Sequence, residues 1–435
     1  MKIGVLGGGL TGMTLGSLLN SDVEILEKNP ETGGLCRSME CEGFTFDYGG
    51  SHIIFSKDRE VMNFMLNSLG ENKNKCKRNT KILFKGRYVK YPFENGLRDL
   101  SLKDNFECLY YYLNNIIDIA NNKLDKPKNF KDWIYYNFGR GIAEKYMIPY
   151  NEKIWNTKVD LMCLDWINNR IPKPPLEDII KSSLGIKTEG YKHQLFFYYP
   201  KKGGIQSLVR SIEKGIRGKV TVNYPITSIY NEDGKWIVSN GKDDRVFDNI
   251  ISTIPIADMI AALRDVPGDI KNIVKNLKYN SLITVMVGLD TPKLNDISWL
   301  YLPESDMLAN RVSFPSNFSE YVAPKGRTSV LAEITCTMCD QIWNMSDEEI
   351  ADETIQGLHR LNILDKEKIC ACKVRRSRYA YVIYDLDYFS KMQVIYSYFN
   401  MLGVKLCGRF GEFKYLNMDA CIRSAMDRSK ELKEK

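Results

Sequence analysis

The stretch KIGVLGGGLTGMTLGSLL, residues 2–19, decides the fold of this chain. An apolar strand leads into three spaced glycines, Gly7, Gly9 and Gly12, and a helix with small residues follows. At this spacing the glycines permit a tight turn, a close approach of the backbone to a pyrophosphate, and close packing of the helix on the strand. The phosphates would lie at the positive end of that helix. The stretch therefore predicts a Rossmann-type dinucleotide-binding domain.

Two neighbouring features indicate which dinucleotide is bound. The next apolar strand, VEILE, ends at Glu27, whose carboxylate is placed to accept a hydrogen bond from a ribose hydroxyl and disfavours a 2′-phosphate. The segment NPETGGLCRS then supplies Gly33, Gly34 and Arg37, which again combine glycine for close approach with a cation for phosphate. Nicotinamide enzymes do not usually need this second element, so the combination points to FAD rather than NAD.

Later segments predict that the nucleotide-binding domain is discontinuous. The stretch ISTIPI, residues 251–256, has the pattern of a strand that returns to it. The stretch CGRFGEFKYLNMDACIRSAM, residues 407–426, supplies a Gly-Arg turn and a closing helix whose N-terminus would face the flavin. Between these segments, residues 96–190 show apolar residues at helical spacing, and prolines at positions 172, 174 and 175 are expected to end that block. Strand patterns separated by glycine turns follow from about residue 191.

Composition excludes several classes of protein. A chain of 435 residues is too long for one ordinary core, so two or three lobes are expected. With 44% hydrophobic and 26% charged residues it is typical of a soluble globular protein, and no apolar run approaches the roughly 20 residues that span a bilayer. We therefore expect no membrane insertion and, because the chain begins directly with a strand and lacks a cleavage site, a cytoplasmic location. The net charge of +7 is spread over short basic runs without a dominant stripe, which argues against nucleic acid as a partner.

Eleven cysteines are scattered without the spacing of a disulfide framework. The closest pairs are Cys336 with Cys339 and Cys370 with Cys372, and neither has a second matching pair or a histidine nearby in the sequence. We expect free thiols and no metal site. The sequence carries no signal for an oligomeric state.

Five further stretches carry a family resemblance. In chain order they are DYGGSHIIFS (47–56), GRYVKYPFENGL (86–97), KPKNFKDWIYYNFGRGIAEKYMIPYNEKIW (126–155) with DWINNR (165–170) behind it, SWLYLPESDMLANRVSFPSNFS (298–319) and GRFGEFKYLNMD (408–419). Together they resemble the signature stretches of the UDP-galactopyranose mutase family, closer to its eukaryotic-type branch. That family lies within the FAD-dependent superfamily of amine oxidases and protoporphyrinogen oxidases.

The resemblance implies an α/β fold: an FAD-binding Rossmann-type domain with an inserted helical domain and a twisted antiparallel β-sheet domain. The boundaries that we expect are a first FAD-binding part at 1–95, a helical uridine-binding domain at 96–190, a sheet and return segment at 191–250, a sheet and substrate domain at 251–400, and a C-terminal FAD-binding return with its closing helix at 401–435.

The resemblance also implies a reaction. A mutase of this family interconverts the pyranose and furanose forms of a UDP-sugar, UDP-galactopyranose and UDP-galactofuranose, through a covalent adduct of the sugar with reduced flavin. NADPH is one possible reductant of that flavin. Two other functions stay open: an FAD-dependent oxidoreductase of the amine-oxidase or protoporphyrinogen-oxidase type, and a non-catalytic flavoprotein that binds nucleotide sugars.

The resemblance assigns roles to individual residues of this chain. Arg170 and Arg311 would clamp the diphosphate, where charge accumulates as the sugar bond breaks, although each taken alone also suits a surface salt bridge. Trp155 would line the uracil, with a tryptophan of the helix core as the alternative. The remaining residues expected to contact substrate are Tyr91, Tyr150, Asn151, Gln194, Tyr301, Tyr381 and Tyr415. Of the tyrosines, Tyr381 lies in a crowded stretch, SRYAYVIYDLDY, where the register is open.

His52 matches the family's histidine at the flavin face, on a loop where Gly49 and Gly50 let the backbone approach the ring. Arg409 would steady the pyrophosphate or the ring edge of FAD, and the helix beginning near Asn417 would direct its positive end toward a flavin carbonyl. At the sugar end the chain departs from the family: a segment that is rich in asparagine in the eukaryotic-type enzymes is YKHQLFFYYP in this chain, so a sugar contact would come from Gln194 or His193.

Overall fold

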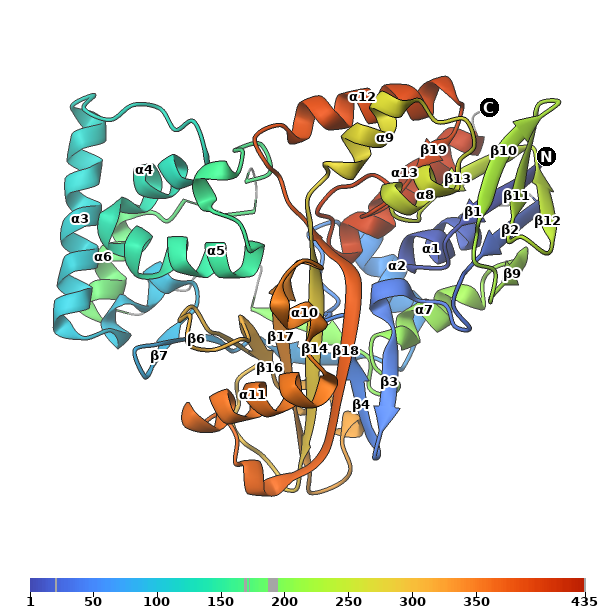
Figure 1. Cartoon of the computed structure of the whole chain (residues 1–435). Coiled ribbons are helices and arrows are strands. Elements are labelled where there is room, and N and C mark those ends of the chain that lie inside the picture. Colours follow the sequence, from blue (N-terminus) through green and yellow to red (C-terminus); the bar gives the residue numbers. More distant parts are fainter. Residues whose placement is uncertain (20–21, 168–169, 172, 187–194, 434–435) are drawn as a thin grey trace.

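The structure is a computed structural model that describes residues 1–19, 22–167, 170–171, 173–186 and 195–433. Three parts are visible in Figure 1: a parallel sheet with helices around it on one side, a block of helices on the other, and a long sheet below and between them. This is the mixed α/β architecture that the sequence predicts, with both a parallel and an antiparallel sheet.

The parallel sheet is assembled from five strands spread over three distant parts of the sequence, residues 2–26, 219–252 and 405–406. Its strands, in spatial order, are β19 (Lys405–Leu406), β13 (Asn249–Ser252), β1 (Lys2–Leu6), β2 (Asp22–Leu26) and β9 (Lys219–Thr221). All four neighbouring pairs run parallel. The central strand β1 is buried on both faces, as expected for a parallel sheet covered by helices, and β13 is the return strand expected at the start of ISTIPI.

Helices pack around this sheet and bury its apolar side chains. They are α1 (Leu10–Leu18), α2 (Arg59–Leu69), α7 (Gln206–Glu213) and α13 (Met418–Lys433). Helix α1 contacts both α7 and α13, so the closing helix at the C-terminal end packs directly on the helix that follows the glycine turn. A small antiparallel sheet lies beside this part, formed by β10 (Ser228–Glu232), β11 (Lys235–Ser239) and β12 (Asp244–Phe247). Helices α8 (Ile256–Ala262), α9 (Gly268–Lys275) and α12 (Tyr388–Met401) follow on the same side.

The helical block contains α3 (Leu102–Ala120), α4 (Phe130–Ile142), a π-helical turn at Ala143–Met147, α5 (Ile148–Trp155) and α6 (Leu176–Leu184). Side-chain caps begin α3 at Ser101 and α4 at Asn129. The expectation that the prolines end this block is wrong, because α6 begins directly after Pro175. A proline is well tolerated at a helix start, where the N–H that it lacks has no partner within the helix.

The long sheet has seven strands, in the order β18 (Ile369–Val382), β14 (Tyr279–Leu289), β17 (Thr328–Cys336), β16 (Arg311–Ser313), β15 (Trp299–Tyr301), β6 (Thr80–Phe84) and β7 (Arg87–Lys90). All its pairs are antiparallel except β15 with β6. Two further two-stranded antiparallel sheets are formed by β3 (Ser38–Cys41) with β4 (Phe44–Asp47) and by β5 (Asn74–Lys77) with β8 (Phe196–Tyr199). Helices α10 (Gln341–Asn344) and α11 (Asp347–Arg360) lie over one face of the long sheet.

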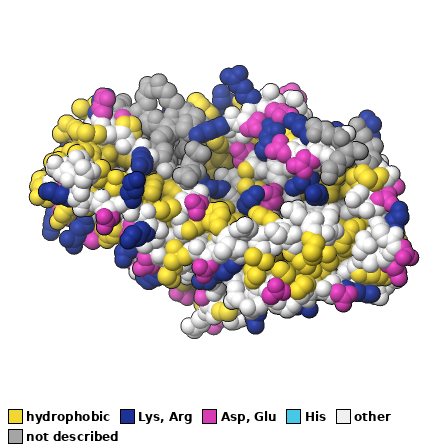
Figure 2. All heavy atoms as spheres, turned by 90° about the horizontal axis from the view of Figure 1, so that it is seen from above, with side chains coloured by type: hydrophobic (Ala, Val, Ile, Leu, Met, Phe, Trp, Pro, Cys, Tyr) yellow, Lys and Arg dark blue, Asp and Glu magenta, His cyan; other side chains and the backbone are white. Residues whose placement is uncertain are grey.

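Basic and acidic side chains are intermingled on the face of the molecule seen from above, with apolar side chains between them (Figure 2). None of the helices within the described part of the chain is both long enough and apolar enough to cross a bilayer.

Candidate active site

The glycine turn after β1 has two kinds of glycine. A Cβ atom at Gly12 would lie 2.0 Å from the carbonyl oxygen of Gly7, so α1 can approach β1 only without a side chain there. A Cβ at Gly9 would meet nothing closer than the Cα of Gly34, at 3.9 Å. The N–H of Gly33 donates to the carbonyl of Gly8 at 2.8 Å, which holds the second glycine pair against the first. Open space lined by backbone therefore lies at the N-terminus of α1, and this arrangement fits a pyrophosphate.

The predicted ribose acceptor also fixes the turn. The Oε2 atom of Glu27 accepts from the N–H of Gly8 at 2.8 Å, and Oε1 accepts from the backbone and side-chain nitrogens of Asn29 at 2.9 and 2.6 Å. Arg37 donates through Nε to the carbonyl of Gly34 at 3.3 Å. The glycine turn after β1, Glu27 at the end of β2 and the second glycine pair are thus held together by hydrogen bonds between these segments.

The difference between the two glycines predicts two different defects. Gly9→Ala should fold as the wild type does, because its methyl group makes no close contact, but should weaken FAD binding by about tenfold or more, since the methyl group fills the space for the pyrophosphate. Gly12→Ala should destabilise the fold itself by about 3 kcal/mol, because α1 must move away from β1. FAD content and thermal unfolding of both variants check this, and full FAD affinity in Gly9→Ala would contradict it.

The loop after β4 carries His52 at a closely packed position. A Cβ at Gly49 would lie 2.0 Å from the carbonyl oxygen of Leu35, and Gly50 has a positive φ of 100°. The Nδ1 atom of His52 lies 2.8 Å from the carbonyl oxygen of Gly50. Because a carbonyl only accepts, Nδ1 carries the proton of the neutral ring, and Nε2 keeps a lone pair that can accept a hydrogen bond.

Burial, together with the nearby guanidinium groups of Arg409 and Arg311, lowers the pKa of His52 from its ordinary 6.5 to about 4, against the opposing effects of the Gly50 carbonyl and the Glu333 carboxylate. The imidazole is therefore neutral at physiological pH. Arg311, one of the two arginines expected to clamp the diphosphate, therefore lies near His52.

This shift has a consequence for stability. Between pH 6.5 and 4 the unfolded chain binds a proton at His52 that the folded chain does not, so the free energy of unfolding should fall as the pH is lowered through this window. The contribution is about 3 kcal/mol, fully present above pH 6.5. In the cofactor-free protein, His52→Gln should flatten this part of the pH dependence in urea titrations. An unchanged slope would show that His52 titrates normally.

Arg311 is held by a carboxylate that sequence reasoning missed. Its Nε and Nη2 atoms donate to Oε1 and Oε2 of Glu333 at 3.0 and 2.6 Å, and Glu333 is completely buried. Burial alone would lower the pKa of the Arg311 guanidinium, and the Glu333 carboxylate outweighs it and raises that pKa. Arg311 is therefore not part of a surface salt bridge. A signal for Glu333 was present, because it is the only charged residue in the stretch SVLAEITC.

The ladder of the long sheet aligns these residues. Tyr301 on β15 is opposite Arg311 on β16, which is opposite Glu333 on β17. The same carboxylate accepts from the backbone N–H of Ser51 at 3.2 Å, next to His52. One face of the long sheet therefore presents a tyrosine and an arginine beside the histidine loop.

More tyrosines surround this ladder. The ring of Tyr301 lies 5.0 Å from that of Tyr91 and 5.2 Å from that of Tyr150, measured between centroids. The hydroxyl of Tyr150 is buried and has no hydrogen-bond partner among the side chains and backbone groups that the structure describes. A buried donor without a partner is expensive in a folded protein, and a phosphate oxygen would satisfy it.

The register of the crowded tyrosine stretch is settled by an irregularity in the sheet. Tyr381 pairs with Asn280, while the next pair is Ser377 with Leu282, so β18 carries three residues where β14 carries one. This bulge directs Tyr381 to the ring of Tyr415, 5.8 Å away. The neighbouring tyrosines go elsewhere, Tyr379 to Asp258 and Tyr384 to Trp166.

Two arginines pack on Tyr415. The guanidinium of Arg170 lies 4.3 Å from the ring centroid and donates to the carbonyl of Tyr415, and that of Arg409 lies 4.6 Å from the same centroid. Arg409 is also held by the carbonyl of Leu416 at 2.8 Å. Its Nε is buried without a partner in the described part of the chain, which suits a contact with a bound flavin nucleotide. Asn417 is exposed, and α13 begins at the next residue, as predicted for the helix near Asn417.

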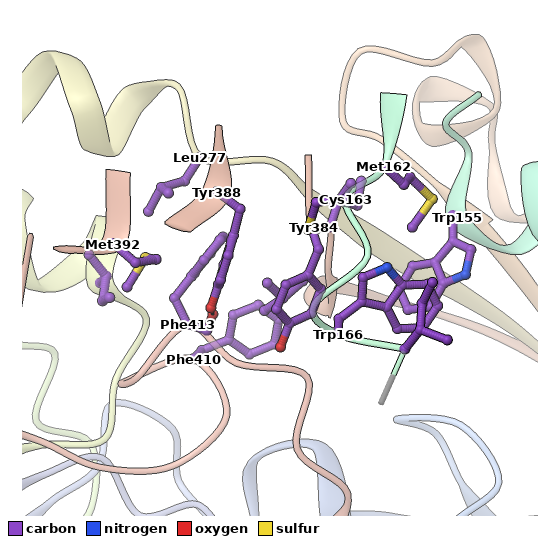
Figure 3. Close-up of a cluster of buried hydrophobic side chains, with 14 of the residues drawn as sticks. Trp155, Met162, Cys163, Trp166, Leu277, Tyr384, Tyr388, Met392, Phe410 and Phe413 are labelled. Atoms are coloured by element: carbon purple, nitrogen blue, oxygen red, sulfur yellow. The ribbon is translucent and has the colours of Figure 1, made fainter. Parts of the chain in front are cut away.

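Trp155 lies between the core and the site. It is 4% exposed, and its Nε1 donates to Oδ1 of Asn151 at 3.2 Å. One edge contacts Trp166 in a row of buried side chains that continues through Tyr384 to Phe410 (Figure 3). Its other neighbours are Tyr415 and Tyr381, at 5.3 and 6.2 Å between centroids. Trp155 therefore belongs to the buried core on one side and borders the candidate site on the other, so both interpretations made from the sequence fit its surroundings.

The structure thus brings together, from five separate parts of the chain, nearly all the residues that the sequence proposed for substrate. Gln194 and His193 lie outside the described residues. Within the described ranges, no three His, Cys, Asp or Glu side chains are grouped so that they could hold a metal ion.

Comparison with known proteins places this geometry in context. Residues 11–386 match the model of a family described as flavin containing amine oxidoreductase. A crystal structure of reduced UDP-galactopyranose mutase superposes with a TM-score of 0.90 at 25% sequence identity, covering 100% of this chain and 95% of that one. An uncharacterised protein in the nifH2 3′ region of Methanothermococcus thermolithotrophicus is 39% identical over 70 residues, which are 15% of this chain and 68% of that protein.

A putative protoporphyrinogen oxidase from Exiguobacterium sp. 255-15 superposes with a TM-score of 0.77 at 17% identity, covering 100% of this chain and 98% of that one. At this identity the similarity concerns the fold alone. Oxidoreductases and a mutase therefore share the architecture seen here.

Proposed function

The chain belongs to the flavin-containing amine oxidoreductase family, and from this premise we propose that it is a flavin-dependent mutase that interconverts the pyranose and furanose forms of a UDP-sugar. The observation that carries the proposal is the ladder of Tyr301 and Arg311 beside the histidine loop, with Arg170 and Arg409 on the neighbouring ring of Tyr415. Several cations and tyrosine hydroxyls around one point suit a diphosphate. The similarity to a reduced UDP-galactopyranose mutase supports the same substrate class.

The family and the glycine turn imply FAD as the cofactor. In this proposal Gly9 and Gly34 leave room for its pyrophosphate, Glu27 would accept from the ribose, and Arg409 would offer Nε, which has no partner among the described residues. Reduced flavin would supply a nucleophilic ring nitrogen to the anomeric carbon of the sugar. His52 contributes a neutral acceptor, Nε2, held on a loop that its glycines bring close to the rest of the chain.

Arg311 is prepared for a phosphate by its pairing with Glu333. Two of its five N–H donors point to that carboxylate, which fixes the plane of the guanidinium and leaves three for an anion. The hydroxyl of Tyr150 would donate to the same anion. These groups stabilise the negative charge that UDP gains when its bond to the sugar breaks.

An oxidoreductase that takes electrons from an amine or a porphyrinogen is the second candidate, because the family and several similar folds belong to that class. Such an enzyme gains nothing from paired arginines at its substrate. A third candidate, a flavoprotein that binds nucleotide sugars without turning them over, would share the binding residues.

One experiment separates these functions. The purified yellow protein is reduced with dithionite without oxygen and incubated with UDP-galactofuranose, while UDP-galactopyranose is followed by chromatography. Conversion only in the reduced sample supports the mutase. If UDP binds but no isomer appears, other UDP-hexoses are tried next, and turnover of none would favour the binding protein. If UDP does not bind, the oxidoreductase takes precedence, and amine-dependent peroxide formation is measured.

NADPH as the reductant is part of the same proposal. Anaerobic mixing of the oxidised protein with NADPH should bleach the flavin absorbance, and no bleaching would point to another electron donor.

A further inference from the structure

The last carbonyl groups of helix α5 accept hydrogen bonds from outside the helix. The last carbonyls of any helix lack a partner within it. In α5 they accept hydrogen bonds from the long sheet: the Thr335 hydroxyl donates to the carbonyl of Lys153 at 3.0 Å, and Nδ2 of Asn280 donates to those of Ile154 and Trp155 at 3.2 and 2.7 Å. Helix α5, which carries Tyr150 and Trp155, therefore ends in a socket formed by β14 and β17.

Asn280 is the central residue of this socket. It is completely buried, and it lies opposite Tyr381 at the edge of the bulge in β14 and β18. Its orientation is set by its surroundings: with the amide turned over, Oδ1 would face two carbonyl oxygens, which it cannot bond. One side chain thus touches the backbone of Trp155 and occupies the ladder position facing Tyr381.

The same end of α5 is tied to the strand connection that carries the arginine. The ammonium of Lys153 donates to the carbonyls of Leu302 and Glu304 at 2.9 and 2.6 Å, in the connection between Tyr301 and Arg311. The helical block and the long sheet are therefore joined through the last turn of α5, at the point where the proposed nucleotide-binding side chains meet.

We propose that Asn280 is a positioning residue that caps α5 and thereby sets Trp155 in fixed register with Tyr381, so that the uridine end of the site is already formed before the nucleotide binds. This inference rests on the proposed function in one respect, that Trp155 faces the nucleotide. Loss of the cap leaves two buried carbonyls without a donor, so the last turn of α5 loosens and Trp155 is no longer held for the base.

The test compares Asn280→Ala and Asn280→Ser with Ser281→Ala. Ser281 is the next residue, equally buried, and its hydroxyl donates to the carbonyl of Arg378 rather than to α5, at 2.7 Å, so it is a matched control. We expect Asn280→Ala to weaken UDP binding, measured by calorimetry, and to raise KM by about tenfold, with kcat at saturation and FAD content within about twofold of the wild type. Asn280→Ser, which keeps one donor, should lie between, and Ser281→Ala should match the wild type.

Hydrogen exchange makes the inference testable apart from the proposed function. If the wild type binds no UDP, the proposed function fails, and the cap is then judged by the amide protons of α5, which should exchange faster in both Asn280 variants than in Ser281→Ala. Exchange in α5 at the wild-type rate in the Asn280 variants overturns the proposal, and so does a lowered kcat with unchanged KM. Should Asn280→Ala fail to fold, Asn280→Ser carries the same comparison.

Discussion

Replacing His52 with alanine should leave FAD bound and lower turnover by about 10²–10³-fold. The imidazole is neutral, and its Nδ1 proton is committed to the carbonyl of Gly50, so the variant loses a single fixed acceptor, Nε2. The glycines of the loop and the pyrophosphate turn are unchanged, which is why cofactor content should not fall. Single-turnover conversion of the UDP-sugar by the reduced variant, beside its flavin spectrum, is the measurement.

His359 offers a matched control. It lies on α11, with Nδ1 3.3 Å from the carbonyl of Leu364, and is no part of the site. His359→Ala should retain wild-type turnover. Full activity in His52→Ala would remove His52 from the site.

Replacing Arg311 with lysine should lower kcat by about 10²–10³-fold although the positive charge is kept. The planar guanidinium bonds both oxygens of Glu333 and still has donors for a phosphate, whereas an ammonium on a flexible chain cannot do both in a fixed geometry. In the proposed reaction the phosphate contacts of Arg311 would strengthen as UDP departs, so the effect should fall on kcat more than on KM. Steady-state kinetics with the reduced enzyme checks the split.

Arg376→Lys is the appropriate comparison. The guanidinium of Arg376 on β18 also donates to several acceptors, namely the carboxylate of Asp347 and the carbonyls of Trp343 and Met345. It lies on the side of the sheet that α10 and α11 cover. It should leave turnover unchanged. Turnover by Arg311→Lys within a few-fold of the wild type would show that the arginine does not contact the diphosphate.

The parts of the fold that depend on local sequence were predictable. The glycine turn, the strand that leads into Glu27 and the helix that begins after Asn417 all follow from patterns within a few residues. The helix after Pro175 was missed for a local reason too, because a proline after the end of one helix cannot be distinguished, in the sequence alone, from a proline at the start of the next.

The parts that depend on pairing between distant strands were not predictable. The partner of Arg311 lies 22 residues away on a neighbouring strand, and only the register of β16 with β17 brings the two together. The direction of Tyr381 is set by a bulge that leaves no mark in the sequence of β18. Asn280 gave no sign of its role either, since its partners are backbone atoms of a helix 125 residues earlier.

The order of strands in the parallel sheet has a consequence for how the protein is made. Of the strands in this sheet, β1 emerges from the ribosome before the others, but its neighbour β13 follows only after residue 248, and β19 and Arg409 only after residue 404. Until β13 has been made, a nascent chain therefore exposes an unpaired apolar strand edge, a state that favours aggregation or chaperone binding. With Arg409 in its proposed role, the flavin site is complete only after residue 409 has been made, so flavin supply should influence the yield of folded protein after that point of synthesis rather than before it.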